Sequence, residues 1–266
     1  MHRHGPTDPT TMGPRLLAAP AAVALAAALA LGAAACDAPS GPGAAAASAA
    51  VSRASNAATY RVTLHNTAGA LQPLTPAVIA LHAPATGIYT VGEPASPQLE
   101  RLAESGTRDP LATLLGNDSR AFDVTIATGP GGPFLPDEEG SATIQGPPGS
   151  RLSLAAMLVC TNDGFTGLDG VRLPGHVGGT ETFQLHAYDA GTEQNTEAST
   201  DLVPPCVMAT TGSEGGTVAD QPAIAEQNVV RPHPGIDDDT DGNDILTVGQ
   251  HQWSDPIATV RVERIH

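Results

Sequence analysis

Apolar and polar residues alternate in short stretches along the chain from about residue 60 onwards. In the stretch 60–65, Tyr60, Val62 and Leu64 fall on one face and polar residues on the other, which is the pattern of a half-buried β-strand. Gly and Pro recur at short intervals after residue 66, which favours many short strands joined by turns. The same pattern predicts further strands at 77–82, 122–127, 141–145, 152–159, 182–187 and 258–265.

Two short helices are expected among these strands. The stretch 96–104 has Ser96 at the N-cap, Pro97 at the first helical position and Gly106 near its end. A second brief helix is expected over 109–116. No long amphipathic helix alternates with the strands, as a parallel α/β fold would require. The predicted fold class is therefore all-β: an antiparallel two-sheet β-sandwich with one or two short helices in loops.

The first 36 residues have the layout of a secretion signal. Arg15 precedes an Ala/Leu-rich run that ends near Leu31, and small residues then lead to Cys36. The hydrophobic run is short for a membrane span. Met12 would give this segment a more compact basic region than Met1, and either start leaves the prediction of export unchanged.

Residues 33–36, Ala-Ala-Ala-Cys, resemble a bacterial lipoprotein box, in which the cysteine carries lipid. The alternative is ordinary cleavage at the A-x-A site just before Cys36, which leaves a free thiol. Residues 37–58 are mostly Ala, Ser, Gly and Pro and cannot bury enough apolar surface to order themselves. The expected organisation is a signal peptide at 1–36, a disordered linker at 37–58 and one domain at 59–266, attached to a membrane through Cys36.

The chain has three cysteines, and export implies an oxidising compartment. If Cys36 is acylated, Cys160 and Cys206 can form one disulfide. That bridge would close a loop of about 45 residues and remove roughly 4 kcal/mol of unfolded-state freedom in the chain-entropy model. Two buried free thiols are the alternative.

The formal charge is −16, from 28 acidic residues against 12 basic ones, and every basic residue is Arg. Nucleic acid is therefore a poor partner. Fifteen of the acids lie between Asp163 and Asp244, where only Arg172 and Arg231 oppose them. Such crowding favours a divalent cation, although acidic loops that merely keep the protein soluble have the same composition.

Three segments resemble signatures of the spondin domain, a calcium-binding β-sandwich of secreted proteins that is also found in bacterial exported proteins. Residues 157–169 are similar to the family's strand followed by a polar-Asp, aromatic, Gly-x-Asp loop. Residues 188–193, Tyr-Asp-Ala-Gly-Thr-Glu, are close to the family's Tyr-Asp-Ala-Gly-Thr-Asp/Glu element, and 251–260 are similar to its closing segment. The resemblance covers about 59–265. Cys160 departs from it, because bacterial relatives commonly carry proline there.

The resemblance implies a calcium site in the loops at one edge of the sandwich. Asp163 and Asp169 bracket a Gly-containing turn after a strand, and Asp189 begins the turn after another strand. If these strands end at the same edge, the three carboxylates converge, as oxygen ligands of calcium must. Asn162 and Glu193 are further candidates. The alternative is that Asn162, Asp163 and Asp189 only cap turns through bonds to the backbone.

A second acidic loop contains D-x-D-x-D-G, the opening of an EF-hand-type calcium loop, with Asp237, Asp239, Asp241 and Asn243 as its candidate ligands. The twelfth position of this loop is not the bidentate Glu that such loops carry, so the site would be of low affinity. A solvated acidic loop is the alternative.

Sequence motifs of enzymes are missing from the chain. It has no G-x-S-x-G elbow, no P-loop and no dinucleotide fingerprint, and no two histidines have zinc-ligand spacing beside a cysteine pair. We therefore expect a non-enzymatic, calcium-stabilised module that binds an extracytoplasmic protein or glycan. The alternatives are an envelope polysaccharide hydrolase that uses a carboxylate pair, and a purely structural envelope lipoprotein.

Overall fold

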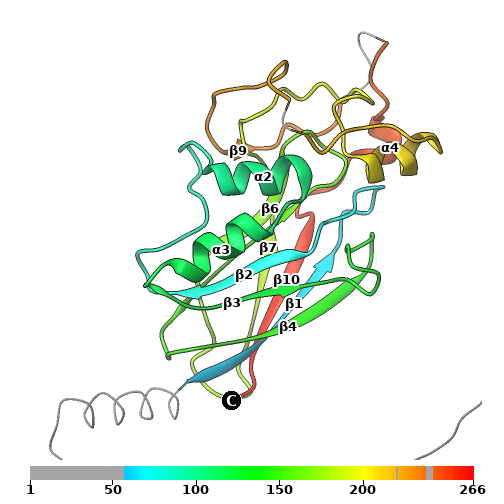
Figure 1. The fold of residues 1–266 in the computed structure, drawn as a ribbon. Coiled ribbons are helices and arrows are strands. Elements are labelled where there is room, and N and C mark those ends of the chain that lie inside the picture. The colour runs from blue at the N-terminus through cyan, green and yellow to red at the C-terminus, as the bar shows by residue number, and fades with distance from the viewer. Residues whose placement is uncertain (1–56, 220, 238–241) are drawn as a thin grey trace, which may run out of the picture.

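The computed structural model describes residues 57–219, 221–237 and 242–266. These residues fold into two antiparallel sheets (Figure 1). The first sheet has four strands in the order β4-β1-β10-β7, so strands from both ends of the described chain lie side by side at its centre. Its strands are β1 (Ala58–Asn66), β4 (Glu139–Gly146), β7 (Thr180–Leu185) and β10 (Ala258–Arg264).

The second sheet has six strands in the order β3-β2-β5-β6-β8-β9, and every neighbouring pair is antiparallel. The expected all-β, antiparallel two-sheet sandwich is confirmed. The strands of this sheet are β2 (Ala77–His82), β3 (Ala121–Ala127), β5 (Arg151–Met157), β6 (Gly164–Arg172), β8 (Ala187–Asp189) and β9 (Arg231–Pro232).

The main core lies between the two sheets. Alternation along β1 buries Tyr60, Val62 and Leu64, each at most 1% exposed, in this core. In the paired strand β10, Val260 and Val262 stand directly opposite Leu64 and Val62. Burying a Val or Leu side chain fully contributes about 1.5–3 kcal/mol. A slip of one residue would turn these side chains to solvent, so the pattern fixes the register.

Strand β2 is buried along its whole length because both faces of its sheet are covered there. Ile79 and Leu81 belong to the inter-sheet core, whereas Val78 and Ala80 belong to a second cluster under two helices. These helices, α2 (Pro97–Ser105) and α3 (Asp109–Asn117), lie on the outer face of the six-stranded sheet (Figure 1).

Helix α2 has the ends that the sequence predicts. The Ser96 side chain accepts a hydrogen bond of 3.2 Å from the Leu99 N–H, Pro97 is the first helical residue, and Gly106 ends the helix at φ +69°. Two further helices in the described residues, α4 (Pro204–Thr211) and α5 (Val248–His251), were not expected.

All seven predicted strands are present, with bounds shifted by a few residues. Strand β6 lies where the sequence pattern predicts a turn, and β1 begins at Ala58, which the composition assigns to the linker. The predictions for the signal peptide, for Cys36 and for most of the linker lie outside the described residues. Within the described part of the chain, no helix is both long and apolar enough to cross a membrane.

The two ends of the sandwich are built differently. We call the apex the end formed by the β5–β6 connection (158–163), β8, β9 and α4, and the base the end where β1 begins and β10 ends (Figure 1).

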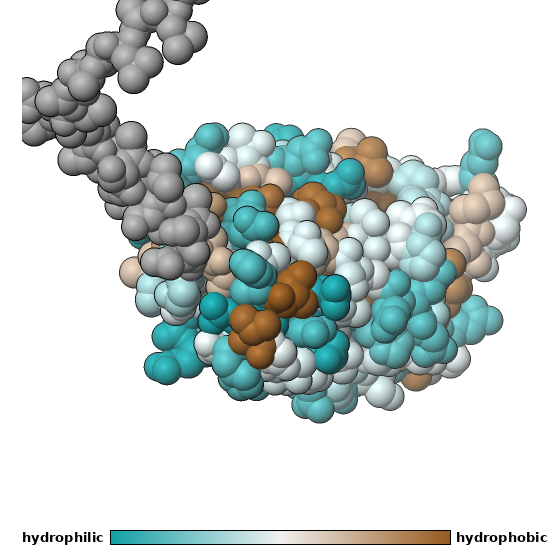
Figure 2. All heavy atoms as spheres, turned by 90° about the horizontal axis from the view of Figure 1, so that it is seen from below, coloured by the Kyte–Doolittle hydropathy of each residue, from teal (hydrophilic) through white to brown (hydrophobic). Residues whose placement is uncertain are grey.

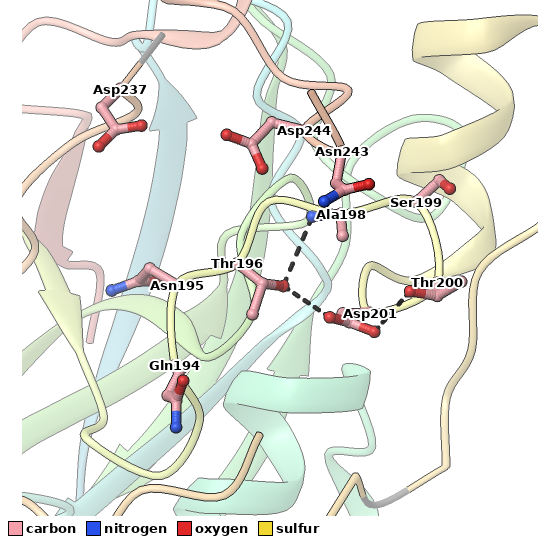
Figure 3. A pocket seen from close by; sticks show the side chains of 10 residues that line it. All are labelled: Gln194, Asn195, Thr196, Ala198, Ser199, Thr200, Asp201, Asp237, Asn243 and Asp244. Atoms are coloured by element: carbon pink, nitrogen blue, oxygen red, sulfur yellow. Dashed lines mark hydrogen bonds between the residues drawn. The ribbon is translucent and has the colours of Figure 1, made fainter. Parts of the chain in front are cut away.

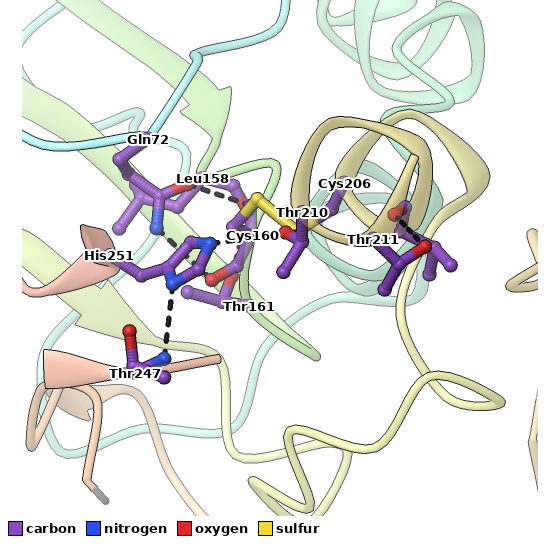
Figure 4. The surroundings of a disulfide bond; sticks show 10 residues. Gln72, Leu158, Cys160, Thr161, Cys206, Thr210, Thr211, Thr247 and His251 are labelled. Atoms are coloured by element: carbon purple, nitrogen blue, oxygen red, sulfur yellow. Dashed lines mark hydrogen bonds between the residues drawn. A yellow bond between two sulfur atoms is a disulfide. The ribbon is translucent and has the colours of Figure 1, made fainter. Parts of the chain in front are cut away.

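The predicted disulfide is confirmed: Cys160 and Cys206 are bonded, with their Cα atoms 5.2 Å apart (Figure 4). The bond joins the β5–β6 connection to α4 at the apex. Gln72 fixes the same connection, since its Oε1 accepts a hydrogen bond of 2.7 Å from the Cys160 N–H and its Nε2 donates one of 3.1 Å to the Cys160 carbonyl.

Candidate metal centre

Two buried aspartates meet at the apex. Asp163 immediately precedes β6, and Asp189 is the last residue of β8. The two strands are antiparallel with Gly164 opposite Asp189, so the register brings Asp163 beside the end of β8. The Ala190 N–H also donates a hydrogen bond of 3.1 Å to the Asp163 carbonyl. Both aspartates are 0% exposed.

The two oxygens of Asp163 have different surroundings. Oδ2 accepts hydrogen bonds from the Thr192 N–H (2.7 Å), the Thr192 hydroxyl (3.1 Å) and the Glu193 N–H (3.1 Å). Oδ1 is equally buried and accepts none. An unsatisfied acceptor in the interior costs about 1–3 kcal/mol, and more when it carries charge. Asp163 Oδ1 is therefore an oxygen atom that a cation would stabilise.

Asp189 is surrounded by donors on both oxygens. Its Oδ1 accepts from the Gly191 N–H (2.7 Å), and its Oδ2 accepts from Asn195 Nδ2 (2.9 Å) and from Arg231 Nη2 (3.1 Å). Arg231 stands directly opposite Asp189 in the β8–β9 ladder, and its Nη2 also bonds Glu226 Oε2 at 3.0 Å. One guanidinium nitrogen is thus shared between two carboxylates.

Burial, and then the negative charge of Asp189, raise the pKa of Asp163 to about 6, although the hydrogen bonds from Thr192 and Glu193 act in the opposite direction. The charged form of Asp163 is therefore disfavoured when no cation is bound. A divalent cation bound to Asp163 would favour its charged form and so oppose that shift. The residues present fit calcium, which takes carboxylate and carbonyl oxygens.

Asp169 does not join this pair, so the prediction that three carboxylates converge is wrong. It is the sixth residue of β6, exposed, and its Oδ1 accepts from the Ile88 N–H (2.5 Å) and the Ser153 hydroxyl (3.0 Å). The error follows from treating 164–169 as a turn. In an extended strand, about 3.3 Å per residue, Asp169 lies far from Asp163.

The weaker candidates Asn162 and Glu193 lie beside the pair and are both buried. Asn162 is engaged at both ends of its amide: Oδ1 accepts from the Glu197 N–H (3.2 Å) and Nδ2 donates to the Thr196 hydroxyl (3.3 Å). It therefore fixes the loop after β8. Glu193 contributes its backbone N–H to Asp163.

A second acidic group lies close by, around a cavity of about 580 Å³ (Figure 3). Carboxylate oxygens of Glu197, Asp237 and Asp244 all lie within 4.8 Å of one another. Of the residues predicted for the second calcium loop, Asp237 and Asn243 line this cavity, while Asp239 and Asp241 lie outside the described residues.

Three residues of the two acidic groups were missed by the sequence analysis: Arg231, Glu197 and Asp244. Each comes to its group through pairing between distant segments, as in the bridge between Ala198 and Asp244 and the ladder between β8 and β9. The D-x-D-x-D-G motif, which ends two residues before Asp244, indicated an acidic loop in that part of the chain. No local pattern marks the other two.

Together, the two-sheet fold, the disulfide and the acidic apex define a β-sandwich module of the kind found outside cells. A family model, Spondin_N, matches residues 70–206, which is about half of the chain. The protein belongs to the Spondin_N family, as the resemblance predicted. The structural unit extends beyond the match, because β1 and β10 form the centre of the four-stranded sheet. A search of curated proteins gives no match.

Proposed function

We propose that the protein is an exported, calcium-binding spondin-type module of the cell envelope, attached to a membrane through Cys36. It binds an extracytoplasmic protein or glycan through the loops at its apex. The observation that carries the calcium proposal is Asp163 Oδ1, a buried carboxylate oxygen with no hydrogen-bond partner, next to the equally buried Asp189.

Charge at the apex supports a divalent ion rather than a proton. Asp163, Asp189 and Glu226 are three acidic side chains, and Arg231, which bonds Asp189 and Glu226, is one basic side chain. The formal charge of this group is therefore −2, in a region where burial strengthens repulsion. A calcium ion held by Asp163 and Asp189 would neutralise it, and neighbouring carbonyl groups or water would complete its oxygen shell.

Burial also supports binding over hydrolysis. A catalytic carboxylate must contact its substrate, and a polysaccharide cannot reach side chains that are 0% exposed. In our proposal the ion instead holds the loop at 189–193 against the end of β6. Such preorganisation lowers the entropy cost of binding a partner at the apex.

The test is calorimetric titration of calcium into the purified protein and into three variants. Asp163→Asn and Asp189→Asn each remove one proposed ligand charge. Asp169→Asn is the matched control, since it makes the same chemical change in β6, outside the site. We expect saturable binding that the first two variants abolish and the control retains. Equal binding by all four proteins would refute the assignment of the site, and no binding by the unmodified protein would refute calcium itself.

A further inference from the structure

At the base, a cleft of about 210 Å³ opens between the ends of the two sheets. It lies at the end opposite the acidic apex, where β1 enters the domain, and Figure 2 looks onto this end. The cleft is lined by residues from β1 and β10 of one sheet, by β5 and β6 of the other, and by the turns beside them. Its lining includes Tyr60, Arg151, Arg172 and Arg264 and contains no Asp or Glu.

The distribution of arginines singles out this cleft. The structure describes nine arginines, and five of them form ion pairs with carboxylates: Arg61, Arg108, Arg120, Arg231 and Arg261.

Of the four described arginines with no carboxylate partner, three line the basal cleft, and the fourth is Arg101 on α2. In a chain of net charge −16, carboxylates are abundant, so three guanidinium groups without an Asp or Glu partner at one place favour another source of negative charge. Strand register adds to the repulsion among them, because Arg151 stands directly opposite Arg172 in the β5–β6 ladder. Like charges in directly opposed positions are destabilising.

Arg264 and Tyr60 have hydrogen-bonding groups in the cleft that the described residues leave unused. Arg264 donates from Nη1 to the Gly175 carbonyl (2.6 Å) and from Nε to the His266 carbonyl (3.2 Å), which leaves its other N–H groups available. Tyr60 stands opposite Arg264 in the β1–β10 ladder and is 1% exposed. Its hydroxyl makes no hydrogen bond to any described residue. Burial raises the pKa of Tyr60, and the charge of Arg264, its neighbour in the ladder, opposes this rise.

We propose that the basal cleft binds a phosphate group, with Arg151, Arg172 and Arg264 as the cationic contacts and the Tyr60 hydroxyl as a neutral donor. Guanidinium groups match the geometry of phosphate oxygens and bind them in pairs of hydrogen bonds. A cleft of this volume has room for a phosphate group. The phosphate comes either from a free anion or from a lipid headgroup, since the domain joins its N-terminal segment at this end.

The experiment measures binding of inorganic phosphate by calorimetry and, separately, sedimentation with vesicles of phosphatidylglycerol or of phosphatidylcholine. Every protein sample carries Cys36→Ala, so that an attached lipid cannot contribute to vesicle binding. Arg151→Gln and Arg172→Gln remove cleft charge, Tyr60→Phe removes only the hydroxyl, and Arg101→Gln is the control with the same change of net charge elsewhere.

We expect the Arg151 and Arg172 variants to weaken binding about tenfold and Tyr60→Phe about threefold, which correspond to about 1.4 and 0.7 kcal/mol. Arg101→Gln should bind like the unmodified chain. The Tyr60 variant keeps the buried ring and loses no internal hydrogen bond, so its melting temperature should not change.

The two arms identify the source of the phosphate. Saturable binding of inorganic phosphate supports a free anion, and binding to phosphatidylglycerol vesicles that inorganic phosphate competes away supports a headgroup. Three results would overturn the proposal: no binding in either arm, an equal loss in the Arg101 variant, or vesicle binding that Tyr60→Phe leaves unchanged.

Discussion

Replacing Asp163 by Asn should stabilise the metal-free protein at neutral pH and destabilise the calcium-bound one relative to the unmodified chain. The folded-state pKa of Asp163 is about 6, against an ordinary 3.8, so the folded protein holds this proton more tightly than the unfolded chain does. The metal-free protein therefore loses stability as pH rises from about 4 to about 6. Above that window the full cost is present, about 3 kcal/mol at 1.36 kcal/mol per pKa unit.

The variant removes this cost without removing the hydrogen bonds. The Asn carbonyl oxygen can take the place of Oδ2 and accept from Thr192 and Glu193, while the amide NH₂ takes the place of Oδ1, which accepts no hydrogen bond. In a chelator at pH 7.5, the free energy of unfolding should rise by up to about 3 kcal/mol. For a domain of this size, that change corresponds to a melting temperature about 6–12 °C higher. At pH 4 the difference should vanish.

The assay is denaturant and thermal unfolding of both proteins at pH 4 and 7.5, with a chelator and with excess calcium. Calcium should stabilise the unmodified protein and leave Asp163→Asn unchanged, so the order of stability reverses. Asp169→Asn is again the control, and as a surface change it should stay within about 0.5 kcal/mol. A variant that is less stable than the unmodified protein in chelator at pH 7.5 would show that the charge of Asp163 is already compensated, and the reasoning would fail.

Three further predictions concern the apex. Arg231→Gln should raise calcium affinity about tenfold in calorimetry, because the guanidinium competes with calcium for the carboxylate of Asp189. Glu226→Gln should lower calcium affinity, because Arg231 then has Asp189 as its one carboxylate partner. Replacing Cys160 and Cys206 together by Ala should lower the free energy of unfolding by about 4 kcal/mol, because the disulfide closes a loop with a sequence separation of 46 residues. Equal stability in denaturant unfolding would refute this chain-entropy argument. Asp244→Asn should leave the stronger calcium isotherm intact and remove any weaker one.

Most of the fold follows from local patterns in the sequence. Alternation in β1 and the caps of α2 predict their elements almost residue by residue. Strand β6 was missed for a definite reason: Gly164 and Gly167 look like turn residues, but a Cβ at either position would clash with a neighbour. A Cβ on Gly167 would meet the Leu154 carbonyl oxygen, and would lie 3.1 Å from a ring carbon of Tyr89. Glycine in a strand often marks such close approach, and nothing in the local sequence distinguishes it from a turn.

The candidate site was predictable where adjacent strands carry it and unpredictable where distant pairing does. Asp163 and Asp189 lie in two of the segments whose resemblance to the family pointed to the site. Arg231 comes from a two-residue strand more than 40 positions along the chain, and its pairing with β8 depends on tertiary structure. Asp169 was wrongly included because 164–169 was expected to be a turn. In the extended strand β6, its side chain lies away from the site.

The arrangement of charge along the sandwich links the two proposals. Carboxylates accumulate at the apex, where β8, β9 and the loop after β8 meet, and three of the four described arginines without an Asp or Glu partner line the cleft at the base. An anionic surface would repel the apex and attract the base, and a divalent ion would bind at the end turned away from that surface. The chain enters at Ala58, on the base, so attachment through the N-terminal segment acts in the same direction as the charge. If both proposals hold, attachment and charge together would turn the apical loops away from the surface, which is the orientation that the proposed partner binding requires.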